Sequence, residues 1–268
     1  MEGIQVGKQT APLKRVLIAN RGEIAIRIAK AASALNMESV SVYAPVDALS
    51  LHTRFSTESK VIDGQNEKTA DPVSSYLDAE ALIRTAKASG CDCIHPGYGF
   101  LSENAEFAER CISEGLTFIG PTPEGLSLFG DKIRARELAQ SQDVPVVPGS
   151  EHPLASSDEA QQIAQEIGYP VMLKASAGGG GRGMRAVEKA EELVEAFERC
   201  QSEAADAFGD GSLFLEKLIE QPQHIEVQIL ADAQGNVVHL FERDCSVQQR
   251  NQKVLEIAPA PNLDAGLR

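Results

Sequence analysis

The stretch Lys174-Ala175-Ser176-Ala177-Gly178-Gly179-Gly180-Gly181-Arg182-Gly183-Met184 decides the fold of the second half of this chain. A mostly apolar run, residues 169–173, leads into it, and Met184-Arg185-Ala186-Val187 reads as a returning strand. Glycine lets backbone N–H groups approach an anion closely, and successive N–H groups in such a loop form an anion-binding nest. Lysine and arginine at the two shoulders add positive charge. The stretch therefore predicts a strand–loop–strand flap that covers phosphate.

Other interpretations of the glycine-rich flap are weaker. It is not a Walker A loop, because the chain contains no Gly-x-x-x-x-Gly-Lys-Ser/Thr. It also lacks the strand–turn–helix context of a Rossmann fingerprint. The remaining alternative is a merely flexible loop. Because four glycines cost backbone entropy on ordering, their retention by chance inside a hairpin is not expected.

Composition excludes several classes of protein. The chain has 268 residues, 43% hydrophobic and 24% charged, which suffices for about two domains. A formal net charge of −14 disfavours nucleic acids and anionic membranes as main partners. Residues 1–14 are polar, without a signal-peptide core, and we expect a loose leader. Five irregularly spaced cysteines give neither a disulfide framework nor a zinc pattern, and Cys91-Asp92-Cys93 is interpreted as the start of a buried strand. A reducing cytoplasm is the expected compartment.

The order of expected elements indicates an α/β protein with several parts. Residues 15–120 alternate strands with helices, which predicts a mainly parallel sheet covered on both faces. Residues 121–149 form a helical linker and residues 150–218 a smaller α+β unit around the flap. Residues 219–268 begin a third part with a hairpin that turns at 232–236. Two strands and a loop cannot bury a face alone, so we expect this chain to be part of a longer protein.

Individual helices follow from the spacing of apolar residues. We expect a helical face at Ile24, Ile28, Ala31 and Leu35, and a capping box at Ser156 and Glu159. Further expected elements are strands at 16–19, 40–43, 93–94, 117–119 and 213–216, and helices at 76–86, 104–114, 131–142, 156–168 and 193–204.

Several motifs then resemble the biotin carboxylase family, in the order in which that family carries them. They are the opening at 15–25, His95-Pro96-Gly97-Tyr98-Gly99-Phe100-Leu101-Ser102-Glu103-Asn104, the glycine flap, Glu242-Arg243-Asp244-Cys245-Ser246-Val247-Gln248, Gln252-Lys253-Val254, and Ala258-Pro259-Ala260-Pro261. The resemblance implies a Rossmann-like (pre-ATP-grasp) N-terminal domain, an ATP-grasp lid domain, and the start of a C-terminal ATP-grasp domain. It implies carboxylation of carrier-bound biotin with MgATP and bicarbonate, through carboxyphosphate.

The resemblance also assigns residues to ATP. Lys132 and Lys174 resemble the lysines that contact the phosphates, and two such point charges on different elements can clamp a polyphosphate. The flap glycines Gly178, Gly179, Gly180, Gly181 and Gly183 are expected to cover the transferred phosphoryl group. Glu216, Lys217 and Leu218 resemble the adenine-binding hinge, with Ile219 packed on the ring. His224 resembles a histidine near the nucleotide.

Lys253 resembles the lysine that holds bicarbonate and carboxyphosphate, and Arg250 and Gln248 lie on the same polar loop. Positive charge there would lower repulsion between anions and favour phosphoryl transfer. Two positions depart from the common pattern: Asn251 stands where many members carry histidine, and Gln249 where arginine is common. The Asn251 amide can hydrogen-bond an anion but carries neither a proton nor a charge.

No metal ligand is assigned within this chain. Magnesium prefers carboxylate oxygens, but the spacing of Glu226, Glu242, Asp244 and Glu256 does not make them ligands. The resemblance places the metal-binding glutamates beyond Arg268, so we expect the 268 residues alone to lack activity. The implied partners are a biotinylated carrier, a carboxyltransferase component and a second copy of the chain. Two alternatives stay open: another ATP-grasp ligase of the carbamoyl-phosphate synthase type, and a non-catalytic nucleotide-binding module.

Overall fold

The computed structural model describes residues 12–62, 73–176, 183–232, 234–249, 252–261, 263–264 and 266–267. They belong to two compact units, of which one ends at Ala135 and the other begins at Arg136. Within the described residues, no helix is both long enough and apolar enough to cross a membrane.

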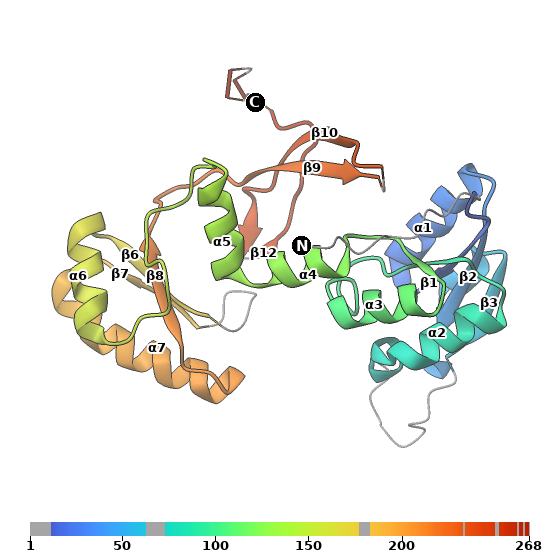
Figure 1. The fold of residues 1–268 in the computed structure, drawn as a ribbon, viewed down its shortest axis with the longest axis horizontal. Helices are drawn as coiled ribbons and strands as arrows, with labels where there is room; N and C mark the ends of the chain where they lie inside the picture. The colour runs from blue at the N-terminus through green and yellow to red at the C-terminus, as the bar shows by residue number, and fades with distance from the viewer. Residues whose placement is uncertain are drawn as a thin grey trace. The chain divides into compact units, whose positions relative to one another are not determined.

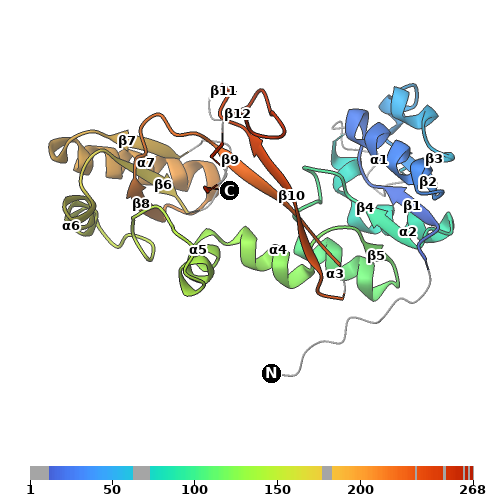
Figure 2. The ribbon, with the colours of Figure 1, turned by 90° about the horizontal axis from the view of Figure 1, so that it is seen from above.

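The N-terminal unit is built on a five-stranded sheet of order β3-β2-β1-β4-β5 (Figures 1 and 2). Every neighbouring pair in it is parallel, which confirms the α/β class and the parallel sheet expected from the sequence. The strands are β1 (Arg15–Ile18), β2 (Glu38–Tyr43), β3 (Glu58–Val61), β4 (Cys93–His95) and β5 (Thr117–Phe118). Its helices are α1 (Gly22–Ala34), α2 (Ala79–Ala88), α3 (Ala105–Ser113) and α4 (Pro123–Gly130), with short 3-10 turns at Pro45–Asp47, Leu51–Arg54 and Ser74–Leu77. Helix α5 (Lys132–Ser141) contains the boundary between the two units, which falls between Ala135 and Arg136.

The expected buried face of α1 was partly wrong. Ile28 is buried, but Ala31 is exposed and Leu35 lies beyond the helix with 71% of its surface exposed. The buried residues are Ala25, Ile28, Ala29 and Ala32, one position further round the helix. Three of these four residues are alanines, so small side chains form most of the buried face of α1.

One strand and one α-helix between residues 12 and 135 were not expected from the sequence. Strand β3 is polar in sequence because it forms an edge of the sheet, where three of its residues are partly buried and one is exposed. Helix α4 begins at Pro123, which was interpreted only as a break, whereas proline at the first helical position leaves no N–H to satisfy. The Thr122 hydroxyl completes this start by accepting a hydrogen bond from the Gly125 N–H at 3.1 Å.

The second unit contains an antiparallel sheet of order β7-β6-β8. Its strands are β6 (Val171–Ala175), β7 (Met184–Val187) and β8 (Leu213–Lys217). Helices α6 (Ser157–Ile167) and α7 (Leu193–Phe208) contact one another and the strands, so both cover the same face of this sheet (Figure 1). The Ser156 hydroxyl caps α6 by accepting from the Glu159 N–H, and Gly168 at φ 77° ends it, as the sequence predicts.

The last part of the chain is an antiparallel hairpin of β9 (Ile225–Ala231) and β10 (Val237–Asp244) (Figure 2). Asp232 closes its turn by accepting from the Asn236 N–H at 2.9 Å, and Gly235 adopts φ 87°. Two short strands, β11 (Gln248–Gln249) and β12 (Gln252–Lys253), pair with each other after the hairpin. An isolated bridge between Asp244 and Ile257 folds this segment back onto the end of β10.

Candidate functional site

The sheet of the second unit has one helix-covered face and one open face. Side chains alternate along a strand, and residues directly opposite on neighbouring strands share a face. Val171, Leu173 and Leu215 are fully buried under α6 and α7. The pairing register places the other set on the open face, where every member except exposed Ala186 is half-buried: Met172, Lys174, Met184, Ala186, Phe214 and Glu216.

On the open face, Lys174 of β6 and Glu216 of β8 form an ion pair. Lys174 lies opposite Phe214, and Glu216 lies opposite Met172, so the two charged groups are diagonal neighbours. Their side chains are 25% and 21% exposed, respectively. The structure thus brings together two residues that the sequence assigned to different ends of ATP, on a floor of methionine and phenylalanine side chains.

Lys217 and Leu218, also assigned to ATP, have other polar partners. The Lys217 ammonium points to the helix-covered side and donates to the carbonyls of Gly168 and Tyr169 at 3.1 and 2.8 Å. The backbone N–H of Lys217 donates to Pro148 O, and that of Leu218 donates to Pro170 O. The Lys217 ammonium therefore fastens the end of β8 to the end of α6. Nucleotide contact by these two residues stays a prediction.

The segment before α6 holds β8 from its outer edge. The Ser150 N–H donates to Leu215 O at 2.7 Å, and the Ser150 hydroxyl accepts from the Leu215 N–H at 3.1 Å. A Cβ at Gly149 would lie 2.4 Å from Leu215 O and 2.9 Å from Glu216 Cα. Only glycine allows this close approach of the two backbones. The position of Glu216 is therefore set by three strands and by this packed segment.

The flap itself lies mostly outside the described residues. Gly178, Gly179, Gly180 and Gly181 are among residues 177–182, so their predicted role is not addressed by the structure. Gly183, at φ 65°, accepts a hydrogen bond from the Ala175 N–H through its carbonyl.

Lys132 begins α5 and is exposed, and it belongs to the N-terminal unit.

A second charged cluster forms where the hairpin meets the segment that follows it. Glu226 of β9 lies opposite Arg243 of β10, and the two side chains form an ion pair. The return of the chain along β11 and β12 brings the Lys253 ammonium to the other Glu226 oxygen at 2.5 Å. His224 Nε2 lies 3.4 Å from the same oxygen, and Arg243 also pairs with Glu256 at 3.0 Å. We call Glu226, Arg243 and Lys253, with His224, the Glu226 cluster.

Gln248 joins the Glu226 cluster through His224. Its amide nitrogen donates to His224 Nδ1 at 2.9 Å and to the Cys245 carbonyl at 3.1 Å. With Nδ1 accepting, the other ring nitrogen carries the proton and faces the Glu226 carboxylate. Three predicted site residues, His224, Gln248 and Lys253, are therefore brought together here. Arg250 and Asn251 lie outside the described residues, and Gln249 is exposed on β11.

The charges of the Glu226 cluster shift the pKa values of its members. Hydrogen bonding to Lys253, supported by Arg243 and opposed by partial burial, lowers the pKa of the Glu226 carboxyl to about 2. The same contact raises the pKa of Lys253 above its usual value. Glu226 is therefore ionised and Lys253 protonated at neutral pH. A protonated lysine in a fixed position suits an anionic ligand.

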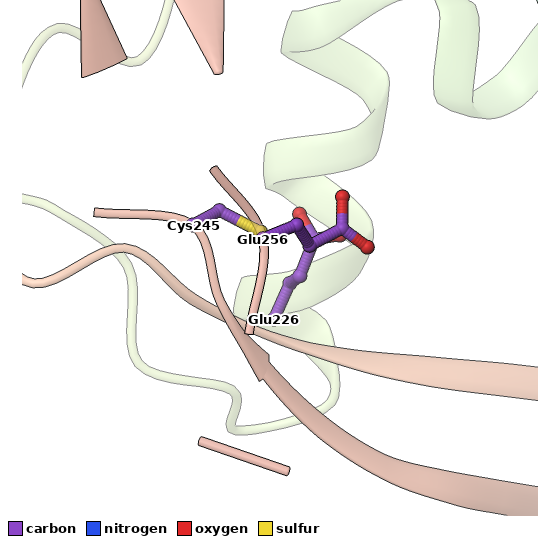
Figure 3. Close-up of side chains that lie close together, drawn as sticks. All are labelled: Glu226, Cys245 and Glu256. Carbon is purple, nitrogen blue, oxygen red and sulfur yellow. The ribbon is translucent and has the colours of Figure 1, made fainter. Parts of the chain in front are cut away.

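Cys245 and Glu256 lie close to Glu226, and one ligand atom of each falls within 4.8 Å of the others (Figure 3). This trio does not fit Mg²⁺, which prefers oxygen ligands and rarely takes a thiol. Burial raises the pKa of the Cys245 thiol, which disfavours the thiolate that a softer metal would need. The carboxylates of Glu226 and Glu256 are also already paired with Arg243. We therefore derive no step through a metal held by these residues.

Glu226 and Arg243 are the residues of this cluster that the sequence did not assign to the site. A signal was present, because His224 and Glu226 are two residues apart and therefore point to the same side of an extended strand. The pairing of Glu226 with Arg243 and Lys253 could not be found in this way, because these two residues lie 17 and 27 residues further along the chain.

Comparison with family models covers nearly the whole chain. Residues 12–126 match the biotin carboxylase N-terminal domain. Residues 131–268 match the ATP-binding domain described for the carbamoyl-phosphate synthase L chain.

Individual relatives agree with these matches. The chain is 53% identical over 256 residues to pyruvate carboxylase of Bacillus subtilis, covering 96% of this chain and 22% of that protein. It is 52% identical over 256 residues to a biotin carboxylase of Halalkalibacterium halodurans, covering 95% of this chain and 55% of that protein. The chain therefore spans about half the length of such biotin carboxylases.

A solved structure gives the same result for the fold. The biotin carboxylase domain dimer of Hydrogenobacter thermophilus 2-oxoglutarate carboxylase, in complex with MgADP, ADP and bicarbonate, is similar with a TM-score of 0.85. The identity is 48%, over 96% of this chain and 55% of that one.

Proposed function

This chain belongs to the biotin carboxylase family, and from that membership we propose that it forms the nucleotide- and bicarbonate-binding portion of a biotin-dependent carboxylase. The proposed reaction transfers the γ-phosphoryl group of ATP to bicarbonate, which gives carboxyphosphate and ADP. Carboxyphosphate then breaks down to carbon dioxide and phosphate, and N1 of a carrier-bound biotin loses its proton to the phosphate and attacks the carbon dioxide to form carboxybiotin.

The observation that carries the proposal is the Glu226 cluster. It holds a protonated Lys253 ammonium in place, 2.5 Å from Glu226, with His224 and Gln248 beside it. Phosphoryl transfer between two anions depends mainly on positioning and on neutralising charge. A fixed ammonium supplies both for bicarbonate and for the developing carboxyphosphate. The relative that was solved with bicarbonate and MgADP supports this choice of ligands.

The open face of the lid sheet is proposed to take the nucleotide. Met172, Met184 and Phe214 offer an apolar floor for a flat ring, and Glu216 offers a carboxylate for the adenine amino group. Lys174 is proposed to contact the phosphates, together with Lys132 and the flap glycines Gly178–Gly181 and Gly183. Lys217, Leu218 and Asn251 complete the proposed nucleotide contacts, and Arg250 and Gln248 assist Lys253. When bound, Mg²⁺ neutralises phosphate charge, and its ligands are proposed to lie outside these residues.

The domain arrangement is part of the same proposal. We assign a loose leader to 1–14, a Rossmann-like domain to 15–120, a linker to 121–149, a lid to 150–218 and the start of a catalytic domain to 219–268. The partners would be a biotinylated carrier, a carboxyltransferase component and a second copy of the chain. All five cysteines are buried and unpaired, which suits a reducing cytoplasm.

The test is bicarbonate-dependent ADP release by the longest native form of the protein, with and without free biotin. We expect biotin to stimulate release, and Lys253→Ala to abolish the stimulation. Lys189→Ala, which removes an exposed lysine on the lid, is the matched control and keeps it. Release that is indifferent to biotin would instead indicate a ligase of the carbamoyl-phosphate synthase type. No release at all would indicate a nucleotide-binding module.

A further inference from the structure

Lys174 and Glu216 form an ion pair on the open face of the β7-β6-β8 sheet, and this pairing affects which ligands can bind there. Its two members are assigned to opposite ends of one ligand, Lys174 to the phosphates and Glu216 to the base. In this structure they form an ion pair with each other. Each charged group therefore occupies a contact that its ligand partner needs.

The geometry of the pair allows a bound ligand to replace each residue as the partner of the other. Both side chains keep a fifth or more of their surface exposed, so a ligand can reach them. The pair is one-to-one, and the structure gives Lys174 no second carboxylate within ion-pair distance among the described residues. A triphosphate carries more negative charge than one carboxylate, and the strand positions of both residues are fixed by the sheet.

We propose that Glu216 is a positioning and selectivity residue that acts by exchange of partners. Glu216 holds Lys174 until a ligand binds that has both a base with an amino group and phosphates. The phosphates then replace Glu216 as the partner of Lys174, and the amino group replaces Lys174 as the partner of Glu216. A ligand with phosphates alone must break the pair and leaves Glu216 unpaired. A ligand whose base presents a carbonyl in place of the amino group meets the Glu216 carboxylate as a second acceptor. The pair thus disfavours both kinds of ligand relative to ATP. This inference rests on the proposed function, since it assumes that the open face binds a nucleotide.

The test compares three ligands on the longest native form of the protein: ATP, ITP and inorganic tripolyphosphate. ITP carries a 6-oxo group where ATP carries the 6-amino group, and tripolyphosphate carries no base. In Glu216→Gln, Lys174 is released from a charged partner, so tripolyphosphate should bind about two- to fivefold more tightly. The new amide can donate to a 6-oxo group, so the ratio of ATP affinity to ITP affinity should fall by about tenfold.

Two controls separate the exchange from a general effect of the substitution. Glu203→Gln makes the same chemical change on the lid, where it removes the Arg185–Glu203 ion pair, and it should leave all three affinities unchanged. In a Lys174→Met background, Glu216→Gln should no longer raise the affinity for tripolyphosphate. Glu216→Asp, which shortens the side chain by one methylene group and so weakens the contact with Lys174, serves as a second variant if the glutamine variant does not fold.

The outcomes distinguish this inference from the proposed function. If Glu216→Gln binds ATP but binds tripolyphosphate no more tightly than the unaltered protein does, the exchange is overturned and the proposal of a nucleotide site stands. Tripolyphosphate binding that rises equally with and without Lys174 also overturns it. Failure of the unaltered protein to bind ATP overturns the proposed function, and the exchange with it.

Discussion

Glu226→Gln is the substitution that tests the charged cluster most directly. It keeps the size of the side chain but removes the charge that pairs with Lys253 and Arg243. Lowering the pKa of a carboxyl from 4.5 to about 2 corresponds to about 3 kcal/mol at 1.36 kcal/mol per unit. Lys253 is 41% exposed, so solvent screens part of this energy, and we expect a loss of about 1–2 kcal/mol at pH 7.

The loss should be confined to the hairpin and to the segment that returns to it. Hydrogen exchange of backbone amides, followed by mass spectrometry, measures such local opening. Peptides that span β9 and β10 should exchange about five- to thirtyfold faster in Glu226→Gln at pH 7, while peptides from the five-stranded sheet stay unchanged. Glu195→Gln, an equal change at a 77% exposed carboxylate on α7, should leave the hairpin as it is.

The pH dependence of the effect follows from the direction of the pKa shift. The folded pKa of Glu226 lies below its unfolded value, so the stabilisation is fully present above pH 4.5 and is lost as the pH falls toward 2. At pH 3 only about 40% of the difference between the two proteins should remain. An equal difference at pH 7 and pH 3 would refute this reasoning, because it would show that shape rather than charge holds the cluster.

Three further substitutions test the packing within each of the two units. Gly149→Ala places a methyl group 2.4 Å from Leu215 O, so we expect a loss of about 1–3 kcal/mol in lid stability and weaker ATP binding by calorimetry. Lys217→Met removes two hydrogen bonds to the end of α6 and should lower the lid's unfolding free energy by about 1–2 kcal/mol in urea. Tyr76→Phe removes a hydrogen bond to Asp47 and an acceptor for the Ala44 N–H, and should cost about 1–3 kcal/mol in the N-terminal unit alone. An equal loss in both units would contradict the last two predictions.

The sequence predicted those parts of the fold that depend on local patterns. The alternation of strands and helices gave the parallel sheet, and Ser156 with Glu159 gave the start of α6. The sequence-based predictions were wrong or missing where a residue type is more exposed or more buried than usual. Strand β3 is polar because it lies at a sheet edge, and α1 buries small alanines while Leu35 stays exposed.

For the candidate site, too, local sequence patterns predicted the residues but not their contacts. Residue types and motif order predicted Lys174, Glu216, His224 and Lys253, but they could not predict which side chains pair. The partner of Lys174 comes from a strand 42 residues away, and that of Lys253 from one 27 residues away. Such pairs depend on strand register, which the sequence does not state. The register also turns the Lys217 ammonium away from the open face, toward the end of α6.

The two lysines assigned to anions are held in different ways, and this difference bears on what each can do. Lys174 pairs with the Glu216 carboxylate, which contacts no other cation among the described residues. An incoming phosphate can therefore replace Glu216 as the partner of Lys174. Glu226 instead pairs with Lys253 and Arg243 together, and Arg243 also binds Glu256, so two cations face two carboxylates in one network. Drawing Lys253 away would leave Arg243 holding Glu226 in place, so the ammonium can contact an anion without the cluster coming apart. In a chain of net charge −14, such carboxylates keep cations at defined positions. Lys174 is thus suited to exchange its partner for a phosphate ligand, and Lys253 to contact an anion while Glu226 and Arg243 stay in place.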